Sequence, residues 1–189
     1  AHFVRSGDAI DNEARHRGNS TYFPDRVVPM LPDNLSGNLC SLHEGEKRAC
    51  IVVKIKIDSV GNKISHKFTR AVIQSWASLE YGEVQEVIDK GKGKPKVLDL
   101  VNTVIKPLYD AYSCLKISRK ARSPLDLNLP ERKIEIDEKG IVKDVRFKER
   151  LEAHKLIEEF MILANVCAAE TLSYKKTPTI FRVHEEPDK

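Results

Sequence analysis

The sequence predicts an α+β fold in which antiparallel β-hairpins pack against long α-helices. Residues 51–78 and 133–147 each alternate apolar and polar side chains around a short turn, which is the period-two pattern of half-buried strands. Residues 97–115 and 149–174 repeat apolar side chains every three or four positions, as amphipathic helices do. The 189 residues suit one domain of this kind, or most of one.

Composition places the chain among globular proteins. Hydrophobic residues make up 41% and charged residues 32%, and no apolar run approaches the roughly 20 residues that span a bilayer. The net charge of +4 permits a polyanionic partner without requiring one. We find no secretory signal and expect no membrane association and a cytoplasmic location. The first residues, 1–4, resemble the tail of a buried strand, so the start looks like a cut.

The four cysteines do not predict a metal site. They form no C-x-x-C pair, and no histidine pair has ligand spacing, so we expect no zinc site. All four are expected to be reduced, as in cytosolic proteins. Cys167 lies in an apolar helical run and is predicted to be a buried thiol.

The N-terminal quarter is predicted to be a surface helix followed by a long loop. Residues 8–18 are polar and end at Gly18, which favours a short helix. Three prolines then block regular structure in residues 24–32. The aromatic pair Tyr22 and Phe23 lies in this loop, where functional residues are common.

The first hairpin is expected to place Ile51, Val53, Ile55 and Ile57 on one face, with a turn at residues 58–62 and a returning strand in residues 63–78. A short helix over residues 82–90 should end at Gly91. The basic linker that follows lacks the spacing of a phosphate-binding loop.

The helix predicted over residues 97–115 has a possible bend at Pro107 and a basic end. Those cations either complement the helix C-terminus, which we favour, or contact phosphate. The second hairpin should turn at residues 137–140, and residues 179–183 are expected to form a further strand.

The long helix over residues 149–174 carries a polar pair within a largely apolar sequence. Glu158 and Asn165 are seven positions apart and therefore lie almost one above the other, while Glu159 lies about 100° round the helix. One interpretation is a solvated stripe in which both glutamates pair with lysines. The alternative is that one glutamate and Asn165 face a ligand, since a carboxylate accepts hydrogen bonds from ribose hydroxyls or base edges.

Several motifs along the chain resemble one enzyme family. They are AHFVR at 1–5, RGNSTYFPDRVVPMLP at 17–32, LIEEFMILAN at 156–165 and FRVHEEP at 181–187. In this order and spacing they resemble the ribonuclease II/R family, and residues 133–150 are more similar to the ribonuclease R branch. The resemblance implies an internal fragment of an RNB-type catalytic domain that spans residues 1–189.

This resemblance implies a 3′→5′ exoribonuclease that hydrolyses single-stranded RNA to nucleoside monophosphates with Mg2+ in a two-metal mechanism. Such an enzyme needs aromatic faces that stack bases and a polar group that senses the 2′-hydroxyl. It also needs paired metal ions that activate water. The parent enzyme is expected to be a monomer with single-stranded RNA as its partner.

The resemblance also implies RNA-binding residues. Tyr22 matches a tyrosine that packs on bases, and Tyr81 matches one near the terminal nucleotide that is linked to ribose selection. Either Glu158 or Glu159 matches the neighbouring acidic residue, and Asn165 is included because it is aligned with Glu158.

Departures from the family pattern leave two alternatives open. The metal-binding aspartates should precede Ala1 and the transition-state arginine should follow Lys189, so no catalytic residue is expected within these residues and the fragment alone should be inactive. The family's second base-stacking aromatic is expected near residues 125–128, where no aromatic residue occurs and Leu127 is its counterpart. The alternatives are a non-catalytic RNA-binding relative of the same fold and a domain with no RNA role.

Overall fold

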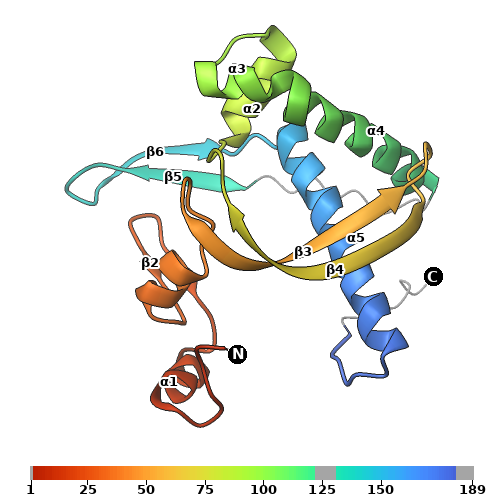
Figure 1. The fold of residues 1–189 in the computed structure, drawn as a ribbon. Helices are drawn as coiled ribbons and strands as arrows, with labels where there is room; N and C mark the ends of the chain where they lie inside the picture. Colours follow the sequence, from red (N-terminus) through yellow and green to blue (C-terminus); the bar gives the residue numbers. More distant parts are fainter. Residues whose placement is uncertain (1, 122–130, 182–189) are drawn as a thin grey trace, which may run out of the picture. The chain divides into compact units, whose positions relative to one another are not determined.

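The computed structural model describes residues 2–121 and 131–181 (Figure 1). The chain divides into two compact units that are interleaved in sequence. The first unit comprises Ala1–Val52, Thr69–Glu80 and Leu125–Arg150, and the second comprises Val53–Phe68, Tyr81–Pro124 and Leu151–Lys189. Helices and antiparallel hairpins make up these units, so the predicted α+β class is confirmed.

The first unit begins with helix α1 (Ala9–Arg17), as predicted. The Asp8 carboxylate accepts a hydrogen bond from the Asp11 N–H at 2.7 Å, and Gly18 ends the helix with a φ of 72°, a conformation that glycine adopts without strain. Two short paired strands follow, β1 (Thr21–Tyr22) and β2 (Val27–Val28), and then the π-helical turn η1 (Asn34–Leu39). Residues 2–4 do not form the expected strand tail, and Phe3 is exposed.

Strands β3 (Lys47–Ile57) and β4 (Lys63–Gln74) form the first predicted hairpin. The Asp58 carboxylate accepts hydrogen bonds from the N–H groups of Val60 and Asn62 and so closes the turn. The expected apolar face is only partly correct, because Val53, Ile55 and Ile57 are half-buried whereas Ile51 is 72% exposed. The strand passes from the first unit to the second after Val52, so Ile51 lies outside the unit in which the other three pack.

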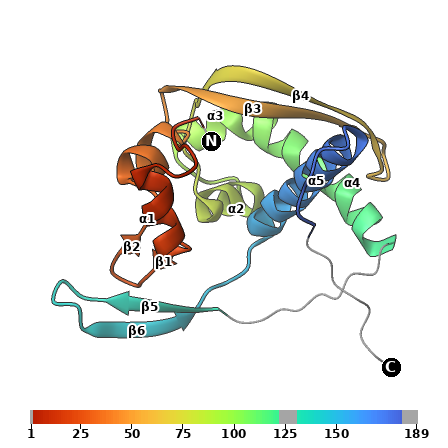
Figure 2. The same ribbon diagram turned by 90° about the horizontal axis from the view of Figure 1, so that it is seen from below.

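The second unit contains α2 (Tyr81–Lys90), α3 (Pro95–Leu100), the π-helical segment η2 (Val101–Ile105), α4 (Lys106–Ala121) and α5 (Glu152–Tyr174). Helices α4 and α5 lie against each other, and α2 also contacts α5 (Figures 1 and 2). The core of the α2–α4 segment consists of Val87, Val97 and Ile105.

The helix predicted over residues 97–115 is interrupted just before Pro107, where a bend was considered. The irregularity precedes this proline as η2, and Pro107 lies in the first turn of α4, where a missing backbone N–H costs little. Sequence periodicity does not reveal the π-helical segment, because one wider turn changes the spacing of apolar residues too little to be recognised.

The turn of the β3–β4 hairpin packs closely on α4. Gly61 has a φ of +82°, and a Cβ at this position would lie 2.2 Å from the carbonyl oxygen of Cys114. Farther along β4, Nε2 of His66 lies 2.7 Å from the hydroxyl of Thr171 in α5. This hydroxyl donates a hydrogen bond to the carbonyl of Cys167 at 2.8 Å. The hairpin is therefore fixed to α4 at its turn and to α5 along its strand.

The second predicted hairpin is present as β5 (Arg132–Ile136) and β6 (Val142–Phe147), with an irregularity at Ile136. Residues 179–181 are not in a strand, contrary to the prediction, and residues 182–183 lie outside the described part of the chain. Cys167 has no exposed surface, as predicted, and all four cysteines are free. Within the described residues, no helix combines the length and apolar character needed to cross a membrane.

Candidate functional site

One face of α5 carries the polar residues that the sequence singled out. His154, Glu158, Met161 and Asn165 follow one another at spacings of four, three and four, which places them on one side of the helix. We call this set the α5 stripe. The buried residues Ala153, Leu156 and Cys167 lie on the opposite side, whereas Met161 is 61% exposed and Asn165 is exposed. The stripe therefore faces away from the core of its own unit.

Tyr81 lies at the N-terminal end of the α5 stripe. It is the first residue of α2, and its ring stacks on the ring of His154 with centroids 4.2 Å apart and an interplanar angle of 21°. Tyr81 remains 44% exposed. An aromatic ring supported on one face and still partly open is suited to stacking a planar ligand.

The His154 ring is held by the N-terminus of its own helix. Its Nδ1 accepts a hydrogen bond from the backbone N–H of Leu151, the N-cap residue of α5, at 3.2 Å. The neutral ring therefore carries its proton on Nε2. This contact fixes the orientation of the ring on which Tyr81 stacks.

Gln85 ties α2 to the same helix end. It lies one turn after Tyr81, and its Oε1 accepts a hydrogen bond from the backbone N–H of Ala153 at 3.0 Å. This N–H is one of the first-turn donors that have no partner within a helix. The two helices are thus joined at two adjacent turns of α2.

The two glutamates of α5 differ in environment. The Glu159 side chain is 4% exposed and forms an ion pair with Arg119 of α4, whereas the Glu158 side chain is 40% exposed and lies 3.8 Å from the same guanidinium. The interpretation of both as solvated partners of lysines is therefore wrong for Glu159, which is buried against an arginine. Glu158 shares the α5 stripe with Asn165, as the spacing predicts.

A second cluster joins α4 and α5 at the start of α5. The Glu152 carboxylate accepts hydrogen bonds from Lys155 at 2.8 Å and from Lys116 and Tyr112 at 3.1 Å. The hydrogen bond from Lys155 is the largest of the effects that lower the Glu152 pKa to about 2. Burial raises the pKa of Tyr112, and its hydrogen bond to Glu152 adds to this.

This cluster also answers the question about the basic end of α4. Lys116 pairs with Glu152 and Arg119 pairs with Glu159, so these two cations bind carboxylates of α5. We had favoured the explanation that these cations complement the C-terminus of their own helix. That explanation is incomplete, because the cations also pair with carboxylates of another helix.

Tyr22 belongs to the first unit. It lies in β1 opposite Val27 and is 77% exposed, so it does not cover the core. The neighbouring loop is ordered by the Arg26 guanidinium, which lies 5.3 Å from the centroid of the Phe23 ring. Tyr22 is therefore available for stacking within its own unit.

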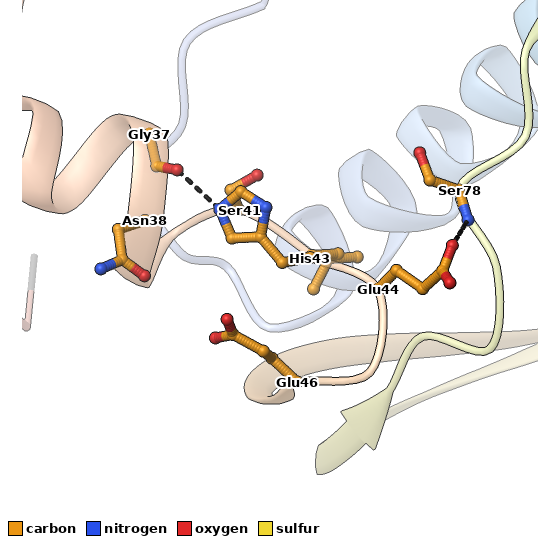
Figure 3. A pocket seen from close by; sticks show the side chains of 8 residues that line it. Gly37, Asn38, Ser41, His43, Glu44, Glu46 and Ser78 are labelled. Atoms are coloured by element: carbon orange, nitrogen blue, oxygen red, sulfur yellow. Dashed lines mark hydrogen bonds between the residues drawn. The ribbon is translucent and has the colours of Figure 1, made fainter.

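The first unit also contains an open pocket of about 750 Å³ (Figure 3). His43 Nε2 lies 2.8 Å from the Gly37 carbonyl, and the Ser78 N–H donates to the Glu44 carboxylate at 2.8 Å. None of the predicted site residues lines this pocket. Its walls are of mixed polarity, so they do not select a class of ligand. The lining residues are Gly37, Asn38, Ser41, Leu42, His43, Glu44, Glu46 and Ser78.

Within residues 2–121 and 131–181, no group of three or more His, Cys, Asp or Glu side chains is arranged to hold a metal ion. Leu127, the residue expected where the family has an aromatic, lies outside the described part of the chain.

Sequence reasoning missed His154 and Gln85, and it placed Arg119 at a basic helix end without predicting its ion pair with Glu159. Continuing the stripe four residues before Glu158 would have found His154, because that spacing keeps the same helix face. Gln85 and Arg119 contact α5 across 68 and 40 residues of chain, respectively, and no local pattern reports such contacts.

Comparison with known proteins gives a match over the whole chain. The RNB domain family matches residues 1–189. Ribonuclease R of Escherichia coli (strain K12) is 35% identical over 187 residues, which are 99% of this chain and 23% of that protein. Ribonuclease R of Thermotoga maritima is 38% identical over 192 residues, which cover 100% of this chain and 26% of that protein. The chain thus spans about a quarter of the length of these relatives.

Solved structures give the same result. The apo form of Mycoplasma genitalium RNase R superposes with a TM-score of 0.83 at 31% identity and covers 93% of this chain and 27% of its own. The same protein has been solved with ribose-methylated single-stranded RNA and with double-stranded RNA, the latter with a TM-score of 0.85, 30% identity and coverage of 94% of this chain and 31% of its own.

Proposed function

Because this chain belongs to the RNB domain family, we propose that it supplies RNA-contacting surfaces of a 3′→5′ exoribonuclease of the ribonuclease R type. The enzyme hydrolyses single-stranded RNA to nucleoside monophosphates. The whole-length family match carries this proposal, and the open aromatic and polar residues of the two units support it.

The aromatic residues bind without reading sequence. Tyr22 in the first unit and Tyr81 in the second are both exposed, and every base offers a π-face to such a ring. The family resemblance gives Tyr81 the contact with the terminal nucleotide, and its ring is stacked on His154 at the end of the α5 stripe. Stacking of this kind suits an enzyme that must accept each base in turn.

The polar residues sense the sugar. The partly open Glu158 carboxylate accepts a hydrogen bond from the ribose 2′-hydroxyl, and Asn165 on the same stripe offers an amide. The buried Glu159 forms an ion pair with Arg119 and so keeps the positively charged guanidinium beside the Glu158 carboxylate. A 2′-deoxy sugar would leave the Glu158 carboxylate without this donor.

Magnesium would supply activation of water and stabilisation of the leaving oxygen when bound. Within the described residues no group of three or more possible ligands is arranged to hold a metal ion, so the proposal assigns no magnesium ligand to them. The chain itself therefore contributes binding and orientation of the RNA, and no catalytic side chain is assigned to it.

The test uses the full-length gene product and single-stranded RNA labelled at its 5′ end, with Mg2+ or with EDTA. We expect progressive shortening from the 3′ end with release of nucleoside monophosphates in Mg2+ alone. RNA that is bound but stays intact in Mg2+ would contradict the enzyme proposal and favour the non-catalytic RNA-binding relative. Failure to bind RNA would favour a domain with no RNA role.

A further inference from the structure

The Tyr81 ring has a protein partner on one face. Its centroid lies 4.2 Å from that of His154 at an interplanar angle of 21°, so the two rings are stacked rather than edge-on. Tyr81 keeps 44% of its surface exposed. The second face or the edge of the ring is therefore the part left for a ligand.

His154 is itself immobilised before it meets Tyr81. Its Nδ1 accepts from the Leu151 N–H at 3.2 Å, and Gln85, one turn along from Tyr81, accepts from the Ala153 N–H at 3.0 Å. Both acceptors satisfy backbone donors at the start of α5, which would otherwise have no partner in the helix. The capping of α5 and the placement of Tyr81 thus use the same residues.

We propose that His154 is a positioning residue, whose ring supports one face of Tyr81 so that the ring is presented in one orientation to the terminal nucleotide of single-stranded RNA. This inference rests on the proposed function. A side chain that is already ordered loses less conformational entropy on binding than a free one. His154 therefore increases RNA affinity through Tyr81 and need not touch the RNA.

Two substitutions separate the two roles of His154. His154→Asn keeps a side-chain acceptor for the Leu151 N–H but removes the ring, whereas His154→Phe keeps a ring face but removes the acceptor. We expect His154→Asn to bind RNA about 2- to 12-fold more weakly, which corresponds to the roughly 0.5–1.5 kcal/mol of an aromatic pair. His154→Phe should bind RNA more tightly than His154→Asn, because it keeps a ring face for Tyr81, and it should unfold at a lower urea concentration than the wild type. A purely structural residue would make affinity and stability fall together.

The double-mutant cycle with Tyr81→Ala tests whether His154 acts through Tyr81. Affinity is measured by fluorescence anisotropy on the full-length protein with 5′-fluorescein oligouridylate RNA in EDTA, which prevents degradation. Tyr81→Ala alone should weaken binding by about 5- to 150-fold, as expected for one lost base stack. Adding His154→Asn to Tyr81→Ala should cause no further loss, because the supported ring is already absent.

The outcomes distinguish this inference from the function on which it rests. If Tyr81→Ala weakens binding but His154→Asn does not, or if the His154→Asn loss persists without Tyr81, the positioning role is overturned and the proposed function stands. If His154→Phe binds as weakly as His154→Asn, the ring face is not the cause and the inference also fails. If the wild type does not bind the RNA, both fail.

Discussion

Tyr22 is an exposed aromatic residue of the first unit, and we predict that it stacks on RNA bases. With 77% of its surface accessible and a place in a two-residue strand, its side chain supports no core. We expect Tyr22→Ala to weaken binding of single-stranded RNA to the full-length protein by about 5- to 150-fold, the equivalent of one base stack, without lowering the urea midpoint.

Tyr174→Ala provides the matched control for Tyr22. Tyr174 is 89% exposed at the end of α5, and no RNA contact is predicted for it. Its substitution should leave affinity within error of the wild type. Equal losses for the two variants, or none for Tyr22→Ala, would remove Tyr22 from the RNA-binding surface.

Glu159 and Glu158 should differ in their effect on stability. Glu159→Gln leaves the partly buried Arg119 without its close partner, and we expect a loss of about 1–3 kcal/mol in the free energy of unfolding, measured by urea denaturation. Glu158→Gln is the isosteric control and should cost less than about 1 kcal/mol, because the Glu158 side chain is 40% exposed. The reverse order would show that Glu158 rather than Glu159 holds Arg119.

The Glu152 cluster should make stability depend on pH. The pKa of this carboxyl is lowered to about 2 in the folded protein from the ordinary value of 4.5, so its stabilisation is present above pH 4.5 and is lost as the pH falls toward 2. Because the side chain is 39% exposed, we expect no more than about 1 kcal/mol. Unfolding measured from pH 5 to pH 2 should show a shallower decline for Glu152→Gln. An unchanged slope would contradict the assignment.

For single residues, the sequence predicted which side chains share a helix face better than it predicted which of them are buried. The seven-residue spacing correctly aligned Glu158 with Asn165, because helix geometry alone decides which residues share a face. It could not tell that Glu159 is buried, since this depends on Arg119, which lies 40 residues away in the chain. The proposed RNA contacts of these residues stay predictions.

Among the elements, the turn of the β3–β4 hairpin has the closest approach to a helix. An alanine Cβ at Gly61 would lie 2.2 Å from the Cys114 carbonyl oxygen, and the φ of +82° is unfavourable for any other residue. We expect Gly61→Ala to lower the free energy of unfolding by about 3 kcal/mol, from about 1–2 kcal/mol of backbone strain and a further cost of overpacking. Urea denaturation measures this change.

Gly82→Ala is the control for the Gly61 substitution. Gly82 is the second residue of α2, and a Cβ there meets nothing within 4 Å. Alanine at this position should raise the free energy of unfolding by about 0.4–1 kcal/mol through reduced freedom of the unfolded chain. A Gly61→Ala protein as stable as the wild type would mean that the turn does not contact α4 in solution.

The sequence predicted the type of most elements and few of their interruptions. Both hairpins and the helices at α1, α2 and α5 were anticipated, because period two and period 3.6 are local properties. The π-helical segment before α4 and the exposure of Ile51 were not, because they depend on how distant segments pack. Residues 179–181 have strand-forming side chains but no strand partner in the described part of the chain.

Considered as a whole molecule, the chain combines a complete family match with a limited share of its relatives' length. It matches the RNB domain over residues 1–189 and covers about a quarter of ribonuclease R proteins. The predicted RNA-binding residues are distributed over both units, Tyr22 in the first and Tyr81, Glu158, Glu159 and Asn165 in the second. RNA binding by residues of both units therefore remains part of the proposal, to be tested on the full-length protein.

The most direct measurement compares degradation of two single-stranded RNAs by the full-length protein in Mg2+, one all-ribose and one with a single 2′-deoxy sugar at the 3′ end. We predict that the wild type removes nucleotides from the all-ribose RNA much faster. Glu158→Gln and Tyr81→Ala should reduce this preference, because they remove the proposed hydroxyl acceptor and the ring that holds the nucleotide. Equal rates on both RNAs for the wild type, or an unchanged preference in both variants, would contradict the account.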